Sequence, residues 1–114
     1  MAYLKNIEQE KVLKLAEEVT AVPGQIVSRT LVQNDAVSIT LFAFAKDEEI
    51  STHTSEGDAM VLVLEGCAEL TVGGVKHLCR AGESIVMPAG IPHAVLGKED
   101  FKMMLTVVFP MEEA

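Results

Sequence analysis

Hydrophobic and polar residues alternate with a period of two over most of the chain after Pro23-Gly24. This alternation is typical of β-strands, in which successive side chains point to opposite faces of a sheet. Gly, Asn, Asp and Pro residues interrupt it at short intervals and mark turns. The runs predict strands over residues 25–33, 36–45, 50–55, 59–64, 67–72, 75–80, 84–87, 93–97 and 101–109. About nine short strands separated by turns predict an all-β sandwich or barrel.

The N-terminal part of the chain has a different period. Between residues 6 and 19, apolar side chains recur mostly three or four positions apart, with charged residues between them. These apolar positions are Ile7, Val12, Leu15, Ala16 and Val19. The spacing predicts a short amphipathic helix that starts at Asn6 and lies against an apolar surface. The two patterns together predict one domain over residues 1–114, with the helix at about 6–19 and the barrel at about 25–109.

Gly73-Gly74 is expected to form a two-residue hairpin turn, which fixes the pairing of the strands on either side. Ala68 then faces Cys79, and Cys67 faces Arg80. Because side chains alternate along a strand, Cys67 and Cys79 fall on different faces of this hairpin. The two cysteines of the chain are therefore expected to stay reduced.

The chain of 114 residues is acidic, with 17 Asp and Glu residues against 9 Lys and Arg residues. A net charge of −8 repels phosphate backbones and anionic lipids, so neither nucleic acid nor a membrane is an expected partner. The N-terminus lacks the basic start and apolar stretch of a secretory signal, so a cytoplasmic protein is expected. Several strands are apolar on both faces, although only one face can line a barrel. A homodimer that covers the outer face is therefore predicted.

Two stretches of the chain combine a strand-like run, a turn and a single histidine. The later stretch contains Gly82, Pro88, Gly90 and His93. This spacing resembles the second motif of the cupin superfamily, in which a histidine follows a Pro-x-Gly bend. The bend should bring His93 onto a strand beside His53.

The earlier stretch, from His53 to Gly66, resembles the first cupin motif only in part. Ser55 stands where the family has a second histidine, Ala59 where it has a metal-binding glutamate, and Asp47 where it has an opening glycine. The chain looks like a small single-domain bacterial cupin of the conserved-barrel type with a degenerate first motif. The resemblance implies an all-β fold: a small jelly-roll barrel, also described as a double-stranded β-helix.

Typical cupins hold a divalent metal with three histidines and a glutamate, so the resemblance implies a site that has lost part of its ligand set. His53 and His93 remain as candidate ligands for Zn, Ni, Fe, Mn or Cu, and two imidazoles hold such ions only loosely. Asp58 is one residue out of the inward register, so its carboxylate should point away from the histidines. Glu56, in the turn, could swing inward. No other cofactor is expected.

The alternation also indicates which side chains surround the two imidazoles. The expected cavity is lined by His53, Ser55, Ala59, Val61, Met87 and His93. One hypothesis is a binding module that holds a small organic molecule by shape and a few hydrogen bonds, with or without a weakly bound metal. The alternative is a metal-dependent cupin enzyme, such as a dioxygenase, isomerase or decarboxylase acting on a small substrate. No individual catalytic residue is identified by the sequence.

Overall fold

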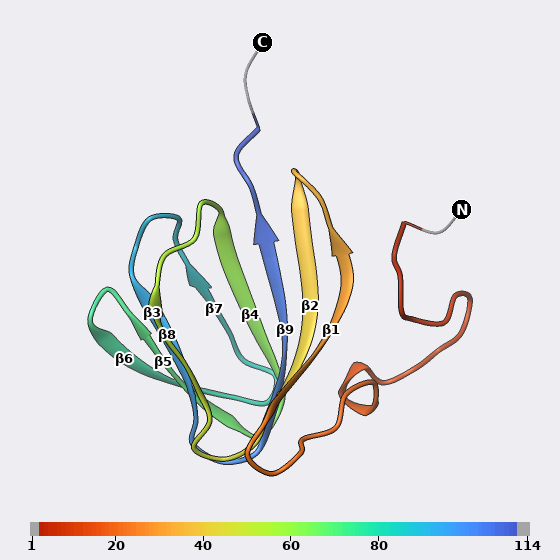
Figure 1. Cartoon of the computed structure of the whole chain (residues 1–114), viewed down its shortest axis with the longest axis horizontal. Coiled ribbons are helices and arrows are strands. Elements are labelled where there is room, and N and C mark those ends of the chain that lie inside the picture. The colour runs from red at the N-terminus through yellow and green to blue at the C-terminus, as the bar shows by residue number, and fades with distance from the viewer. Residues whose placement is uncertain (1–2, 112–114) are drawn as a thin grey trace.

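The computed structural model describes residues 3–111, and its regular structure is almost entirely β-strand (Figure 1). The strands are β1 (Ile26–Gln33), β2 (Val37–Phe44), β3 (Glu49–His53), β4 (Asp58–Glu65), β5 (Cys67–Val72), β6 (Val75–Arg80), β7 (Ser84–Met87), β8 (His93–Gly97) and β9 (Phe101–Val108). They form a five-stranded sheet in the order β1-β2-β9-β4-β7 and a four-stranded sheet in the order β3-β8-β5-β6. The predicted all-β fold is confirmed.

The hairpin at Gly73-Gly74 has the predicted register. Cys67 pairs with Arg80, and Ala68 pairs with Cys79. Both cysteines are free, and Cys79 is buried in the core. Burial raises the pKa of the Cys79 thiol, which is thereby kept protonated and unreactive.

The inner faces of the two sheets share one apolar core. Phe44 of β2 and Phe101 of β9 pack with their ring centroids 4.6 Å apart. Leu70 of β5 and Val95 of β8 approach them from the four-stranded sheet. Because consecutive strand residues alternate between faces, the central strands contribute every second residue to this core, as Ala59, Val61 and Val63 of β4 do.

The helix predicted over residues 6–19 is wrong. Only Leu15–Glu17 form a single 3-10 turn, and the rest of this segment is irregular. Asn6 and Glu10 have φ angles of 59° and 56°, which no right-handed helix accommodates. Val12, one of the apolar positions that suggested the helix, is 99% exposed. None of the helices within residues 3–111 is long and apolar enough to cross a membrane.

Residues 3–24 instead form an irregular strap along the edge strand β1. The Lys5 backbone N–H donates to the Leu31 carbonyl at 2.7 Å, and the Asn6 side-chain amide donates to the Thr30 carbonyl at 2.8 Å. An edge strand presents unpaired carbonyl groups, whereas an isolated helix of this length is marginal in water. The contacts with β1 therefore outweigh the local helical preference.

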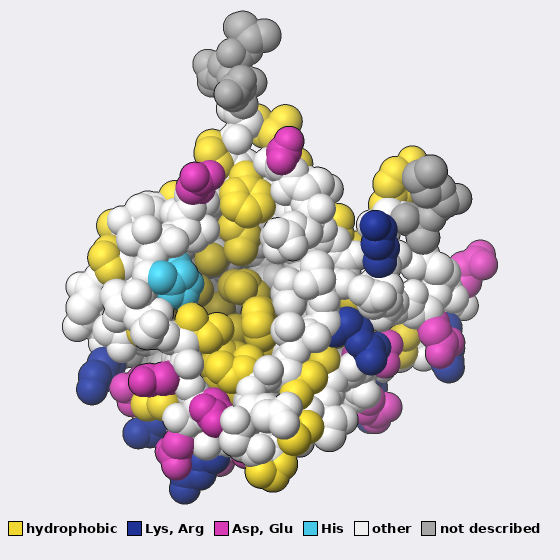
Figure 2. Space-filling view, viewed as in Figure 1, with side chains coloured by type: hydrophobic (Ala, Val, Ile, Leu, Met, Phe, Trp, Pro, Cys, Tyr) yellow, Lys and Arg dark blue, Asp and Glu magenta, His cyan; other side chains and the backbone are white. Residues whose placement is uncertain are grey.

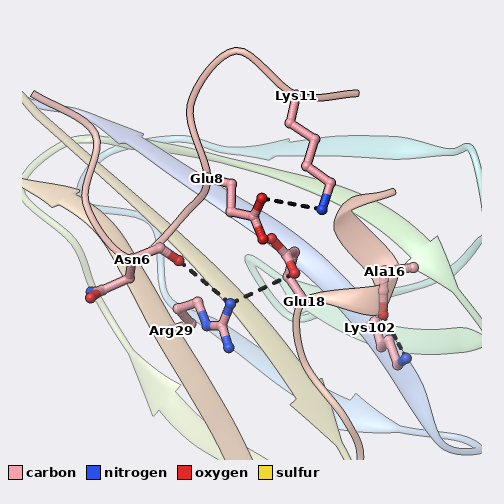
Figure 3. A network of polar contacts seen from close by, with 7 residues as sticks. All are labelled: Asn6, Glu8, Lys11, Ala16, Glu18, Arg29 and Lys102. Carbon is pink, nitrogen blue, oxygen red and sulfur yellow. Dashed lines mark hydrogen bonds and ion pairs between the residues drawn. The ribbon is translucent and has the colours of Figure 1, made fainter. Parts of the chain in front are cut away.

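Two basic side chains of the five-stranded sheet hold the strap (Figure 3). The Arg29 guanidinium donates to the Asn6 carbonyl at 3.4 Å and lies 3.8 Å from the Glu18 carboxylate. The Lys102 ammonium donates to the Ala16 carbonyl at 2.6 Å. The strap thereby covers one half of the outer face of this sheet, where its buried Val19 packs among apolar side chains of the strands: Val27, Leu31, Ile39, Leu41, Ala43, Leu64 and Met104.

The other half of the same outer face is uncovered, and we refer to it as the bare half. It consists of outward residues of β4, β7 and β9: Met60, Leu62, Ser84, Val86, Thr106 and Val108. Met60 and Val86 are direct cross-strand neighbours and are 45% and 52% exposed. The outer face thus carries apolar side chains in both halves, and the strap covers only one of them.

Candidate functional site

The two histidines of the motifs lie opposite each other on neighbouring strands. His53 of β3 pairs with His93 of β8, and Ile50 pairs with Val95. Three steps along β3 thus match two steps along β8, so β3 carries one extra residue as a β-bulge. The bulge turns both Ile50 and His53 toward the interior, although regular alternation would place them on opposite faces.

Each imidazole is oriented by its own backbone. His53 Nδ1 lies 2.8 Å from the Ser51 carbonyl oxygen, and His93 Nδ1 lies 3.2 Å from the Ile91 carbonyl oxygen. A carbonyl oxygen only accepts hydrogen bonds, so each Nδ1 carries a proton and donates it. In the neutral rings, both Nε2 atoms are therefore unprotonated acceptors.

The two Nε2 atoms lie close together, in an edge-on arrangement of the rings. They lie 3.1 Å apart, with ring centroids 4.3 Å apart and ring planes 70° apart. A hydrogen bond between the two Nε2 atoms needs a proton on one of them, whereas a metal ion could be held by both atoms when neither is protonated. At metal–nitrogen distances of about 2.0–2.1 Å, two neighbouring ligands of one ion lie about 3.0–3.4 Å apart. The observed separation fits such a pair.

The two rings differ in their exposure to solvent. His93 is only 3% exposed, whereas His53 is exposed at the edge of the site. Burial lowers the pKa of His93, and the nearby His53 acts in the same direction, while the hydrogen bond with Ile91 partly opposes both. His93 is therefore held in its neutral form, the form that can ligate a metal.

A cavity of about 80 Å³ adjoins the two rings. Figure 2 shows the apolar hollow between the sheets, with a histidine at its edge. Among the described residues, Ser55 is the only polar lining residue besides the histidines, and the other lining side chains are apolar: Ile50, Ala59, Met87, Val95, Met103, Leu105 and Val107. The cavity offers space for a small apolar group next to two converging nitrogen atoms.

Most residues predicted to line the cavity lie there. His53, Ser55, Ala59, Met87 and His93 all contribute to its wall. Val61 does not, because it lies one step deeper along β4, fully buried in the core below the cavity. The alternation identified its face correctly but could not give the depth at which the cavity ends.

The two acidic residues near the motif do not face the histidines. The Asp58 carboxylate points outward, as predicted from the register, and accepts a hydrogen bond from the Ala89 backbone N–H at 2.8 Å. Glu56 lines a separate groove beside Phe109 and Pro110. The Ser55 hydroxyl accepts a hydrogen bond from the Gly57 backbone N–H at 3.2 Å.

The residues present fit part of a metal site. Across residues 3–111, no group of three or more His, Cys, Asp or Glu side chains is arranged to hold a metal ion. His53 and His93 supply two correctly oriented nitrogen donors, each with the outer hydrogen bond that metal-ligating histidines commonly make. Within residues 3–111, Ser55 is the remaining polar group of the cavity wall, and further ligands would come from solvent or from a bound molecule.

Half of the residues in the cavity wall were not predicted from the sequence. The missed residues are Ile50, Val95, Met103, Leu105 and Val107. The β9 residues among them have the same period-two spacing as the residues that were predicted. The face of the sheet on which they lie could therefore be predicted from the sequence. Their position near the histidines could not be predicted, because it depends on β9 lying between β2 and β4 in the sheet.

The first motif keeps its turn conformations although two of the family's metal ligands are absent from it. Asp47, at the position of the family's opening glycine, has a left-handed φ of 72°. Gly66, the closing glycine, has a φ of 80°, and a side chain there would overlap the Asp100 carbonyl oxygen. Both positions thus have conformations that favour glycine.

Comparison with known proteins agrees with this architecture. Residues 40–109 match the family described as the cupin domain. A conserved protein of unknown function from Streptococcus pyogenes is 48% identical with a TM-score of 0.96, and the alignment covers 98% of each chain. A cupin superfamily protein from Desulfitobacterium hafniense is 37% identical with a TM-score of 0.90, over 96% of this chain and 100% of that one.

A third similar structure comes from a longer protein. A cupin 2 conserved barrel domain protein from Leptotrichia buccalis is 42% identical with a TM-score of 0.82, over 84% of this chain and 47% of that one. No curated protein matches the chain. The family match spans more than half of the sequence and contains both histidines of the site. The chain belongs to the cupin family.

Proposed function

We propose that this protein binds a small organic molecule in the cavity between its sheets, beside a divalent metal ion held loosely by His53 and His93. The observation that carries the proposal is the approach of the two Nε2 atoms to 3.1 Å, on rings whose Nδ1 atoms each lie within hydrogen-bond distance of a backbone carbonyl oxygen. Two nitrogen donors bind a divalent ion weakly and leave other coordination positions open.

The cavity supports binding more than catalysis. A bound divalent ion acts as a Lewis acid and orients a ligand. The two imidazoles would be occupied as metal ligands, and no other titratable side chain lines the described cavity. A metal-dependent enzyme would need a separate acid or base at this place.

Metal titration of untagged protein tests the metal part of the proposal. We expect weak, saturable binding of Zn²⁺ or Ni²⁺ by calorimetry, and loss of that binding in His53→Ala and in His93→Ala. His77→Ala is the matched control, because His77 is an exposed histidine of β6 outside the cavity. Equal metal binding by all three variants and the parent protein would contradict the assignment.

Thermal stabilisation tests the ligand part. Small metabolites should be screened with added Zn²⁺ and again with EDTA, because a ligand that binds the folded state raises the midpoint of unfolding. We expect at least one compound to stabilise the protein but not Ala59→Leu, which adds bulk to the cavity wall. A screen in which no compound stabilises the protein under either condition contradicts small-molecule binding.

We also propose that a second copy of the chain covers the bare half. The six side chains of the bare half are uncharged, and the Asp58 carboxylate at its end, beside Val108, is hydrogen-bonded to the Ala89 backbone N–H, so two copies of this acidic protein can approach over most of the patch without opposed carboxylates. The patch continues the apolar face that the strap covers elsewhere, and large apolar patches of this kind commonly mark interfaces. A two-fold arrangement would place each Met60 and Val86 against the same patch of its partner.

Solution mass measurement tests this interface. The double variant Met60→Lys with Val86→Lys should be monomeric at concentrations where the parent protein is dimeric. Lysine is the informative choice because it lowers the net negative charge, so general repulsion cannot explain dissociation. Leu78→Lys is the matched control, since Leu78 is 52% exposed but lies on β6 of the other sheet. A monomeric parent protein would overturn the proposal.

A further inference from the structure

The inner face of the β1–β2 hairpin presents hydroxyl groups beside the cavity. Leu105 and Val107 of β9 line the cavity. Their direct neighbours on β2 are Thr40 and Ser38, which share this face of the sheet. Thr30 of β1 pairs with Thr40 and extends the row by one more strand. The inner face therefore changes from apolar at β9 to hydroxyl-bearing at β2 and β1.

The two faces of this hairpin are reversed relative to an ordinary β-sandwich, in which the apolar side chains point inward. The outer face is apolar and packs against the strap, with Val27, Leu31 and Leu41 in the covered cluster. The inner positions next to the hollow include serines and threonines: Ser28, Thr30, Ser38 and Thr40. The strap thus covers the apolar side of the hairpin, and the hydroxyl side faces the hollow.

Exposure to water alone does not account for this hydroxyl wall. The outer face of the β5–β6 hairpin, which also faces solvent, carries charged side chains, among them Glu69, Lys76 and Arg80. The inner positions of β1 and β2 carry no charge, although Ser28 is exposed. Thr40 is only 9% exposed. A few uncharged polar groups beside apolar side chains are typical of a site that recognises a small molecule.

The hollow joins the histidines to the hydroxyl wall. Figure 2 shows apolar side chains at its floor, a histidine on one rim, and backbone with side chains that are neither apolar nor charged on the opposite rim, where Figure 1 places β2 and β1. Neighbouring strands lie about 4.7–4.9 Å apart, so Thr40 and Thr30 lie one and two such spacings from β9. The cavity of about 80 Å³ holds only a few water molecules at about 30 Å³ each, so a larger ligand would extend toward these hydroxyls.

The floor and the wall together define the ligand. A hydroxyl group both donates and accepts hydrogen bonds, so a row of hydroxyls on the protein pairs well with hydroxyls on a ligand. The inward side chains of Phe42, Met103 and Leu105 suit a hydrocarbon face. A charged ligand would be poorly accommodated, because the inner positions of the described strands β1, β2 and β9 offer no opposite charge.

We propose that the ligand site extends from the cavity across the hollow to the hydroxyls of Thr30, Ser38 and Thr40. Its ligand is an uncharged molecule with two or more hydroxyl groups along one edge and a hydrocarbon face that lies on Phe42 and Leu105. Saturated polyols such as sugars and phenols with adjacent hydroxyls share this chemistry. The inference rests on the small-molecule part of the proposed function and requires no metal ion.

Backbone amide NMR spectra recorded with EDTA test the inference, with methyl β-D-glucopyranoside and catechol as probes. Tetrahydropyran and phenol are the matched controls, because each has fewer hydroxyl groups on the same kind of ring. We expect saturable shifts of the Thr30, Thr40 and His53 amides with at least one probe, and affinity for its control at least about fivefold weaker. Shifts with the glucoside alone would identify saturated polyols, and shifts with catechol alone would identify phenols.

Variants connect the binding to the hydroxyl wall. Thr30→Val with Thr40→Val removes two hydroxyls but keeps the side-chain shape, and should weaken binding of the probe by about tenfold or more. Thr71→Val is the control, because Thr71 lies on the outer face of β5 in the other sheet, and should leave the affinity unchanged. The same spectra show whether each variant is folded, and Thr30→Val alone should show a smaller loss.

The inference is overturned if neither hydroxyl-rich probe causes saturable shifts on β1 and β2, or if each control binds as tightly as its probe. Unchanged affinity in the double threonine variant would also overturn it. The proposed function is decided separately by its metabolite screen, in which a compound that shifts only amides of the cavity wall would retain small-molecule binding without the extended site.

Discussion

The two motif regions of this barrel keep different parts of the cupin pattern. The later region, around Pro88 and His93, combines the bend and the ligand histidine on adjoining elements. The earlier region keeps its turn conformations at Asp47 and Gly66 but has Ser55 and Ala59 at the positions of two family ligands. Backbone geometry and ligand chemistry are therefore separable, because the turns close the barrel whether or not the side chains between them bind a metal.

The largest expected effect comes from the turn that the earlier region retains. Gly66→Ala should lower the free energy of unfolding by about 3 kcal/mol or more, because the new Cβ would overlap the Asp100 carbonyl oxygen in addition to the cost of a left-handed φ. Urea denaturation measures the change. Gly74→Ala is the control, since Gly74 has a similar φ of 82° and open space around it, and we expect a loss of only about 1–2 kcal/mol. If both variants lost the same free energy of unfolding, the close approach of Gly66 to the Asp100 carbonyl oxygen would not add to the cost of a side chain there.

Restoring the missing ligands should make the earlier region resemble the typical family site. Ser55→His with Ala59→Glu should tighten Zn²⁺ binding by about 100-fold or more, because both positions line the cavity beside the existing nitrogen pair. Calorimetry measures the affinity. Ser55→His with Met60→Glu is the matched control, because Met60 is the next residue along β4 and points outward. The site geometry would be wrong if both double variants bound zinc equally tightly.

Acidic pH should reveal the asymmetry between the two histidines. The pKa of His93 is lowered in the folded state, chiefly by burial, so at mildly acidic pH the unfolded chain binds more protons than the folded one. Its contribution is thus destabilising at acidic pH: stability should fall as the pH drops below about 6.5 toward the folded-state pKa. Urea denaturation with EDTA at pH 7.5, 6.5 and 5.5 tests this, and His93→Gln should have a shallower pH dependence. An unchanged slope in His93→Gln would show that other groups dominate.

The smallest effect is expected at the opening turn of the earlier region. Asp47→Gly should raise the free energy of unfolding by about 0.5 kcal/mol, because glycine adopts the left-handed φ of 72° without steric cost but loses more chain entropy on folding. Thermal denaturation should show a small increase in the midpoint. Lys46→Gly, at a neighbouring position without a left-handed φ, should instead destabilise the protein. Destabilisation by Asp47→Gly would mean that the aspartate side chain stabilises this turn.

The strands and their local pairing could be predicted from the sequence, because they depend on short-range alternation and on turns such as Gly73-Gly74. Two parts of the structure depend on contacts that alternation does not encode. The strap is irregular because β1 offers carbonyl partners to Lys5 and Asn6, which no local pattern indicates. The bulge in β3 changes which residues face the cavity, so Ile50 was missed.

The orientation of the two imidazoles has a consequence for protein engineering. Each ring is bonded through Nδ1 to the carbonyl oxygen two residues earlier in its own chain segment, and the two residues are direct cross-strand neighbours. Apart from each other, the two rings have no side-chain hydrogen-bond partner within residues 3–111. Two histidines placed in the same way on an unrelated antiparallel ribbon should therefore reproduce this pair of converging nitrogens.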